Sequence, residues 1–372
     1  MKMMTVEEKQ IRAVVEVFNI EGEFLSYELI QSGHINVTYK VFVLRHGEVK
    51  DYIVQRVNTY VFKNPEAVMK NIAGVTEYVR AKIKSTGVSA KRYVLHYAKT
   101  ENGDYYAVLP DGGFWRCCRF IDGSKSFLFP ENEQIVEESG KAFGEFQRYL
   151  SDYPVRDLEI VIPHFHNTVM RYETFKQSVA NNEARRRVWI EEEINGYLEL
   201  EEIATRLYKM QRCGELPLRV THNDTKTSNV LFDAETNGHL AVIDLDTVMP
   251  GLVAFDFGDA IRIAANTGAE DEKDLDKVQV DMKKYEAFTR GFVGEVKEML
   301  TDNEKATLAL GAVAMTVECG MRFLTDYLDG DKYFRVHYAE QNLVRARCHL
   351  VLAKKMIERL DEMQEIVYKY CN

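Results

Sequence analysis

The sequence has few cysteines and few prolines, and the cysteines it has are scattered. Its 372 residues include six cysteines and seven prolines, and no two cysteines form a C-x-x-C pair. This is not the density of a disulfide scaffold, so we expect reduced thiols. The neighbouring Cys117 and Cys118 would point to opposite faces of a strand, which favours a packing role for them.

The sequence also lacks long runs of basic residues and long runs of apolar residues. No basic run exceeds the triplet Arg185–Arg187, and the formal net charge is −10, so we expect no nucleic-acid partner. No stretch approaches eighteen consecutive apolar residues, so we expect no membrane span. Residues 1–18 mix charged with apolar side chains, which predicts an amphipathic helix rather than a signal peptide. We therefore expect a cytoplasmic protein that is a monomer or a weak oligomer.

What the chain does contain is typical of a globular protein. Hydrophobic residues make up 46% and charged residues 28% of the sequence. A chain of this length exceeds the size at which a single core stops growing, so two lobes are expected.

The first third of the chain predicts a small β-rich lobe. Turn signals separate short runs of strand-forming residues, and one segment that begins at a proline has helical spacing. The strands are expected at 27–31, 37–44, 52–57, 93–97, 105–109 and 114–121, and the helix at 65–83. Asp122 and Gly123 break the pattern. We place the lobe boundary there, with residues 1–121 before it and 122–372 after it.

The second part of the chain is mainly helical. Helical patterns cover 131–150, 184–211 and most of 274–372. Short strands around 220, 230–232 and 240–243 interrupt them. The sequence thus predicts an α+β protein, with a β-rich lobe followed by a larger helical lobe.

The segment that contains these short strands also contains a motif of catalytic residue types. His222, Asp224, Lys226 and Asn229 form an H-x-D-x-K-x-x-N pattern, and Asp244 follows at the end of an apolar strand. This combination is the pattern of a kinase catalytic loop followed by a metal-binding aspartate. Each residue alone would more often be a turn residue, a cap or a solvated charge. Their joint spacing favours catalysis.

Phosphoryl transfer depends on positioning and on charge neutralisation, so each residue type has a role. Asp224 is predicted to align the acceptor hydroxyl and accept its proton, and Lys226 to reach the transferred phosphate. Asn229 and Asp244 offer the hard oxygen ligands that Mg²⁺ prefers. His222 is predicted to brace the loop. The expected cofactors are ATP and Mg²⁺.

These motifs resemble the aminoglycoside phosphotransferase-like branch of the protein-kinase-like fold, which includes choline and homoserine kinases. The resemblance spans nearly the whole chain and implies two lobes, a small antiparallel sheet with a helix and a larger helical lobe. Within the branch, residues 243–251 and 322–328 are similar to those of sugar 1-kinases. That similarity implies ATP-dependent phosphorylation of the C1 hydroxyl of an N-acetylhexosamine, GlcNAc or GalNAc.

The nucleotide site departs from the general kinase pattern. No G-x-G-x-x-G loop is present, and the amides of Ser32, Gly33 and His34 are the candidates to meet phosphate. Gln55 stands where kinases usually place a lysine. Either Gln55 or the neighbouring Arg56 could contact the nucleotide.

Further residues are assigned by the same resemblance. The stretch from Arg119 to Ile121 would offer backbone groups to adenine, or would simply be a buried strand end. Asp256 and Asp259 are predicted to open a helix and brace the catalytic loop. Asp246 is left open between a magnesium contact and a structural role.

The sugar itself is expected to be held by a small set of side chains. They are Asp224, His34, Arg322 and Tyr333. Alternatively, Arg322 would form a pair within its helix, with Asp326 or Glu318. His34 would cap a turn, and Tyr333 would pack in the core.

Two other functions stay open. The first is a kinase of the same fold that acts on choline, homoserine or an aminoglycoside. A cationic acceptor of this kind needs uncompensated carboxylates or an aromatic cage. The second is a nucleotide-binding protein without catalysis, suggested by Gln55 and the short glycine loop.

Overall fold

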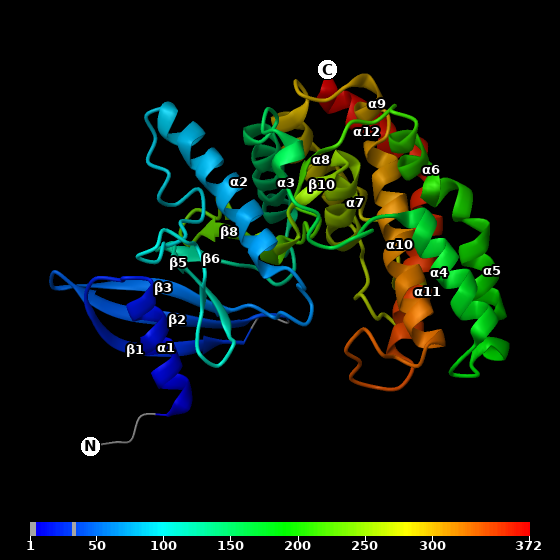
Figure 1. Cartoon of the computed structure of the whole chain (residues 1–372). Coiled ribbons are helices and arrows are strands. Elements are labelled where there is room, and N and C mark those ends of the chain that lie inside the picture. Colours follow the sequence, from blue (N-terminus) through cyan, green and yellow to red (C-terminus); the bar gives the residue numbers. More distant parts are fainter. Residues whose placement is uncertain (1–4, 32–34) are drawn as a thin grey trace.

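Two lobes lie side by side in the computed structural model, which describes residues 5–31 and 35–372 (Figure 1). The first lobe contains a five-stranded antiparallel sheet with the order β1-β2-β3-β5-β4. The second lobe is mainly helical. The predicted fold, a kinase-like pair of a small β-rich lobe and a larger helical lobe, is confirmed.

The first lobe is built from five strands and two helices. They are α1 (Val6–Val17), β1 (Glu23–Ile30), β2 (Val37–Arg45), β3 (Glu48–Arg56), α2 (Pro65–Ser85), β4 (Ala107–Val108) and β5 (Phe114–Arg119). Helix α2 begins where predicted, because Asn64 caps it by accepting from the N–H of Ala67 at 3.1 Å and proline fills its first position.

Strand alternation gives the sheet two faces of different character. Apolar side chains of β2, β3 and β5, among them Val41, Val54 and Cys117, pack with α1. Gln55 and Arg116, which are paired in register, lie on the opposite face. The buried Cys117 and Cys118 are free thiols within the sheet, as expected.

The predicted strand at 93–97 is wrong. Within that segment only Tyr97 bridges β5, opposite Cys118. The edge of β5 that faces this segment is short. Strand β4 already pairs with Phe114 and Trp115 at the start of β5. No room is left for a full additional strand.

The second lobe has ten helices within the described residues, α3 to α12, together with short strands and 3₁₀ turns. The helices are α3 (Glu133–Tyr149), α4 (Thr168–Asn181), α5 (Glu191–Glu199), α6 (Glu201–Arg212), α7 (Val253–Ala264), α8 (Met282–Val296), α9 (Asp302–Lys305), α10 (Leu308–Leu328), α11 (Gln341–Glu358) and α12 (Leu360–Cys371).

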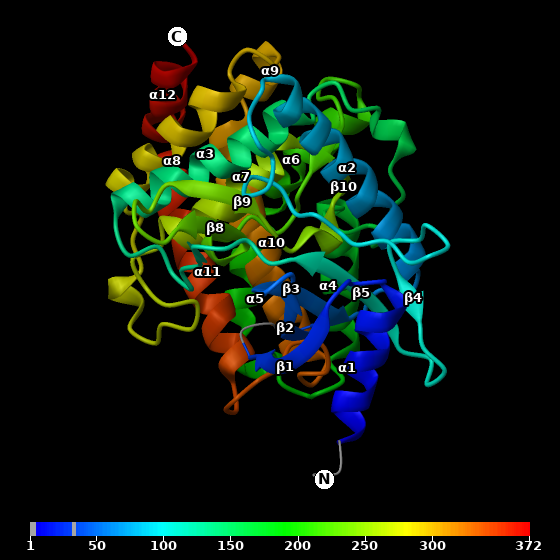
Figure 2. The same ribbon diagram turned by 90° about the vertical axis from the view of Figure 1, so that its left-hand side faces the viewer.

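Short strands and turns carry the loops between these helices. They are β6 (Ser124–Lys125), η1 (Val155–Asp157), η2 (Arg187–Trp189), β7 (Arg219–Thr221), η3 (Thr227–Asn229), β8 (Val230–Asp233), β9 (His239–Val242), η4 (Leu245–Thr247), β10 (Met249–Gly251) and η5 (Leu275–Lys277). The strands form a β6-β8-β9 sheet and a β10-β7 ribbon. Figure 2 shows β8 and β9 between the helices and the first sheet.

The helix predicted over 184–211 begins too early. Asn182 and Arg185 adopt left-handed backbone conformations, with φ of 46° and 57°, so the chain turns before α5. A break at Leu200 then separates α5 from α6. Helix α4, which Asn167 caps by accepting from Met170 N–H at 3.0 Å, was not predicted.

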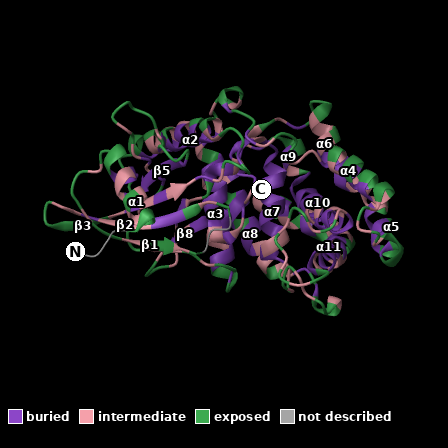
Figure 3. Cartoon of the chain, turned by 60° about the horizontal axis from the view of Figure 1, so that its bottom comes forward, coloured by how far each residue is buried: buried purple, intermediate pink, exposed green. Residues whose placement is uncertain are grey.

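Helix α10 is the centre of the second lobe. It packs against α7, α11 and α4, and Figure 3 shows buried residues gathered along it. Its crossing with α7 is very close, since a Cβ atom on Gly258 would lie 2.1 Å from the carbonyl oxygen of Gly311. Among the described residues α10 alone is long and apolar enough to cross a membrane, but 83% of that window is buried inside the protein, which is typical of a core helix.

Candidate active site

The catalytic loop runs from β7 to η3 and holds the Asp224 carboxylate with two donors. Lys226 Nζ donates to Asp224 Oδ2 at 2.8 Å, and Asn229 Nδ2 donates to the same oxygen at 3.0 Å. Asp224 Oδ1 makes no hydrogen bond with any described residue. Burial lowers the pKa of Lys226, but Asp224 more than offsets this and raises it, so the lysine stays charged.

The first turns of α7 brace this loop, as predicted. Asp256 accepts hydrogen bonds from the backbone N–H groups of His222 and Asn223 at 2.8 and 2.7 Å. Asp259 accepts from the N–H of Thr225 at 3.1 Å. Both carboxylates are buried, and burial raises the pKa of Asp256. They therefore fix the backbone on both sides of Asp224.

His222 has the predicted bracing position as well. Its Nε2 atom lies 2.9 Å from the carbonyl oxygen of Ile243, and its Nδ1 atom accepts from the N–H of Asp224 at 3.2 Å. The ring is buried against Phe143 and Phe146. His222 thereby joins the catalytic loop to the segment after β9 that carries Asp244.

Asp244 and Asn229 fit a magnesium ion. Asp244 takes a left-handed conformation with φ of 59°, and its carboxylate makes no hydrogen bond or ion pair with any described residue. Desolvation and the carboxylates of Asp246 and Asp224 raise the pKa of Asp244, a strain that a dication would relieve. The Nδ2 group of Asn229 is occupied by Asp224, so its Oδ1 atom is the free ligand. The two residues also lie on neighbouring chain segments, because Ile243 N–H donates to the Asn229 carbonyl at 2.8 Å.

Asp246 has a structural role. Its carboxylate forms a buried ion pair with Nη1 of Arg116, and its other oxygen accepts from Asn36 Nδ2 at 2.6 Å. Arg116 and Asn36 belong to the first lobe. Both oxygens of Asp246 are thus occupied by residues that tie the lobes together, and a second metal contact is not favoured.

Gln55 supports this ion pair. Its Oε1 atom accepts from Arg116 Nε at 2.9 Å, and its Nε2 group donates to Thr38 Oγ1 at 3.0 Å. The lysine that kinases usually carry at the position of Gln55 is absent, and Arg116 of β5 lies directly opposite Gln55 in register. Arg56 does not replace this lysine, because its guanidinium pairs with Asp111 at 3.1 Å beside Trp115, on the other face of the sheet. That alternative is wrong.

Arg119 and Ile121, the residues predicted to offer backbone groups to adenine, differ in whether their N–H groups are free. The N–H of Arg119 donates to the His96 carbonyl at 3.0 Å, so it is not available to adenine. The N–H of Ile121 meets no partner among the described residues, although its carbonyl accepts from Ser124 Oγ at 2.6 Å. Only Ile121 keeps a free backbone donor. Ser32, Gly33 and His34 lie outside the described residues.

Arg322, which the sequence predicts to hold the sugar, lies on α10. Within the described part of the chain it forms no salt bridge, and the pairs proposed within its helix are not made. Its guanidinium lies 5.8 and 5.4 Å from the ring centres of Tyr333 and Phe334. Tyr333 is 71% exposed, so the prediction that it packs in the core is wrong.

The two carboxylates nearest Arg322 in its helix have other partners. Asp326 accepts from the N–H groups of Tyr333 and Phe334, at 2.8 and 2.9 Å, and so shapes the connection that follows α10. Glu318 accepts from Thr168 Oγ1 at 2.6 Å and contacts His166, as described below. Neither carboxylate forms an ion pair with Arg322.

The comparisons with known proteins agree with this geometry. Residues 26–288, more than half of the chain, match the model of the "Phosphotransferase enzyme family". The chain belongs to that family.

Solved structures of other phosphotransferases have the same fold. An aminoglycoside phosphotransferase from Alicyclobacillus acidocaldarius matches with a TM-score of 0.61 and 12% identity, over 96% of each chain. An ethanolamine kinase from Plasmodium vivax matches with a TM-score of 0.54 and 14% identity, over 93% of this chain and 91% of that one. A spectinomycin phosphotransferase in complex with ADP and spectinomycin matches with a TM-score of 0.53 and 15% identity, over 100% and 99%.

Two residues of this phosphotransferase site were missed from the sequence. Arg116 could have been found as a charge in the middle of an otherwise apolar stretch, because buried arginines are almost always paired. His166 gave no such signal. Its Nδ1 atom lies 2.8 Å from Glu318 Oε1, and its buried Nε2 atom has no partner. Burial would raise the pKa of Glu318, but His166 and Thr168 outweigh it and lower that pKa.

Proposed function

We propose that the chain transfers the γ-phosphoryl group of ATP, with Mg²⁺, to the anomeric C1 hydroxyl of an N-acetylhexosamine. The observation that carries the proposal is that the Arg322 guanidinium forms no salt bridge with any described residue and lies beside the rings of Tyr333 and Phe334. A cationic acceptor such as choline or ethanolamine would be repelled by this guanidinium, whereas a neutral, hydroxyl-rich sugar would gain hydrogen bonds from it. A second guanidinium lies nearby, since burial and the charge of Arg322 lower the pKa of Arg171.

The residues of the loop fit the steps of such a transfer. Asp224 holds the acceptor hydroxyl through its free oxygen and takes up its proton. The anomeric hydroxyl is more acidic than an ordinary sugar hydroxyl, so a carboxylate is an adequate base. Lys226, already 2.8 Å from Asp224, supplies positive charge next to the oxygen that receives the phosphoryl group.

The metal would be held by Asp244 and by Oδ1 of Asn229. When bound, Mg²⁺ neutralises the phosphate charge that develops during transfer. Ile121 offers its free N–H group to adenine. The ion pair of Arg116 and Asp246 connects the first lobe to the segment that carries Asp244.

A panel of acceptors tests the proposal. Purified protein with Mg²⁺ and ATP would be given GlcNAc, GalNAc, choline, ethanolamine, homoserine and spectinomycin, and phosphate transfer would be measured for each. We expect transfer to the free sugars and none to their 1-O-methyl glycosides, which lack the anomeric hydroxyl. Turnover of choline, ethanolamine, homoserine or spectinomycin alone would reject the sugar assignment. Nucleotide binding without transfer to any acceptor would favour a non-catalytic role.

A further inference from the structure

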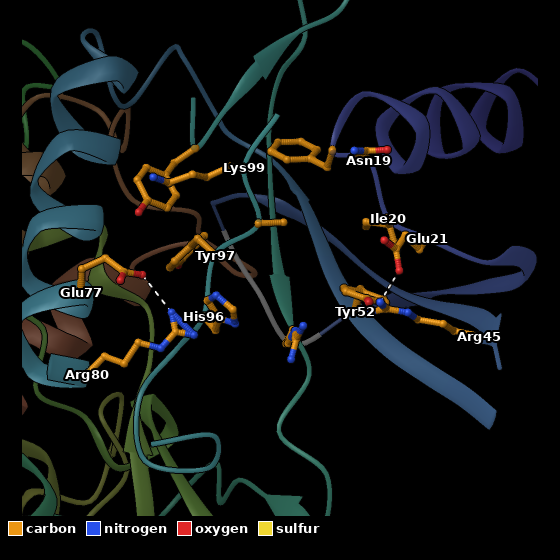
Figure 4. Close-up of a pocket in the computed structure, with 14 residues that line it drawn as sticks. Asn19, Ile20, Glu21, Arg45, Tyr52, Glu77, Arg80, His96, Tyr97 and Lys99 are labelled. Carbon is orange, nitrogen blue, oxygen red and sulfur yellow. Dashed lines mark hydrogen bonds and ion pairs between the residues drawn. The ribbon is translucent and has the colours of Figure 1, made fainter. Parts of the chain in front are cut away.

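A pocket opens beside the sheet of the first lobe, and no residue of the catalytic loop lines it. Its volume is about 430 Å³, and it lies between the end of α1, strands β3 and β5, the segment 96–99 and helix α2 (Figure 4). This volume lies within the range of pockets that take small organic ligands. Four basic side chains reach its wall, namely Arg45, Arg80, Lys99 and Arg119.

The pocket lies on the opposite face of the sheet from the catalytic residues. Tyr52 and Arg119 are paired in register, and Tyr52 packs with α1. Gln55 and Arg116 are each three residues away along the same strands, so they point to the other face. The segment from Phe18 to Glu21, which follows α1, also lines the pocket.

The charges in the pocket do not balance. Glu21 pairs with Arg45, and Glu77 pairs with Arg80 at 3.0 Å. Lys99 and Arg119 form no ion pair with any residue in the described ranges, and Lys99 Nζ lies 4.7 Å from the ring centre of Tyr105. Two positive charges are therefore left over within one cavity.

His96 shows the effect of this positive charge. It lies in the pocket wall between α2 and the sheet, as Figure 4 shows. Burial, with the charges of Arg80 and Arg119, lowers the pKa of His96 to about 4. The ring is thus neutral at pH 7 and offers hydrogen bonds without adding a third charge.

We propose that this pocket binds a small organic phosphate monoester. A phosphate of this kind carries close to two negative charges at neutral pH, which matches the two uncompensated cations. Arginine holds phosphate through two parallel hydrogen bonds, and lysine adds a point charge. The aromatic rings of Phe18 and Tyr105, also in the lining, offer an apolar surface for the organic part of the ligand.

Titration calorimetry with phenyl phosphate tests this inference on the whole protein. Nucleotide binding would first be saturated with a non-hydrolysable ATP analogue and Mg²⁺, so that the phosphate cannot enter the catalytic site. We expect phenyl phosphate to bind, phenyl sulfate to bind more weakly because it has one charge, and benzyl alcohol not to bind.

Variants of the pocket residues would show whether phenyl phosphate binds in this pocket. Arg119→Gln and Lys99→Met should each weaken phenyl phosphate binding about tenfold, the loss expected for one charged hydrogen bond. Arg156→Gln is the matched control, because Arg156 is 90% exposed and lies far along the chain, in η1. Thermal unfolding would verify that each variant is folded.

Three results would overturn the proposal. They are no binding in the millimolar range, equal binding by wild type and by folded Arg119→Gln and Lys99→Met, and binding that disappears when the ATP analogue is present. None of these results bears on the acceptor assignment, since the acceptor panel is read by transfer and this titration by binding.

Discussion

Arg116 and Asp246 form an ion pair that joins the sheet of the first lobe to the segment of the second lobe that carries Asp244. The side chains are only 2% and 4% exposed. Gln55 supports Arg116 through Nε, and Asn36 supports Asp246 through Oδ2. Breaking a buried pair leaves one charge without compensation, so the loss of either residue should lower both stability and activity.

Arg116→Met and Asp246→Asn should each lower the free energy of unfolding by about 3–5 kcal/mol, because each strands the remaining partner. The double variant should lose clearly less than the sum of the two, which urea denaturation of all three proteins would measure. Arg56→Met is the control. It breaks an ion pair with Asp111 that is 42% and 35% exposed, and should cost about 1 kcal/mol or less. Additive losses for the double variant would contradict the coupling.

This pair also shows where sequence analysis reaches its limit. The spacing of residues 222–229, with Asp244 following, predicted the catalytic loop because local chemistry fixes that spacing. Gln55 indicated that the usual lysine is missing, but not that Arg116 stands opposite it. That fact depends on the register between β3 and β5, which no local pattern encodes.

The helices likewise differ in whether local signals or tertiary contacts set their ends. The segment 65–83 carries its own start signal in Asn64 and Pro65 and was predicted well. The error over 184–211 arose because the left-handed turns at Asn182 and Arg185 are set by contacts with distant residues. Ala184 N–H donates to the carbonyl of Leu328, at the end of α10. Tertiary contacts of this kind override helical spacing.

Asp224→Asn should abolish phosphoryl transfer. An amide keeps the shape of the side chain and can still accept from Lys226, but it cannot take up a proton. We expect kcat to fall by about 10²–10⁴, the usual contribution of a general base, while the affinity for ATP stays the same. Steady-state kinetics and a nucleotide titration would measure the two effects. Asp361→Asn, at an exposed position in α12, should leave both unchanged. A near-normal rate for Asp224→Asn would remove it from the mechanism.

Arg322→Met should weaken binding of the sugar rather than of the nucleotide. The loss of a charged hydrogen bond is expected to raise KM for the acceptor by about tenfold or more. KM for ATP should not change, because Arg322 lies on α10, away from the nucleotide residues of the first lobe. Arg335→Met is the matched control, since Arg335 is exposed in the connection that follows α10. Equal KM values for wild type and Arg322→Met would show that the sugar does not reach this guanidinium.

His239 should make stability depend on pH on the alkaline side. Burial lowers its pKa, but hydrogen bonds from its ring to Glu138 and Glu145 outweigh that effect and raise the pKa to about 9. The folded protein therefore binds a proton that the unfolded chain releases near pH 6.5. The stabilisation is complete below pH 6.5 and is lost as the pH rises through 9, a loss on the order of 2–3 kcal/mol.

Unfolding in urea at pH 6 and at pH 9.5 would measure this loss. His239→Gln cannot gain the charge, so it should be less stable than wild type at pH 6 and nearly equal to it at pH 9.5. The exposed His337, changed to glutamine, serves as the control and should follow the wild-type curve. If His239→Gln loses as much stability between the two pH values as wild type does, then His239 is not protonated in the folded protein, and its contacts with Glu138 and Glu145 are neutral hydrogen bonds.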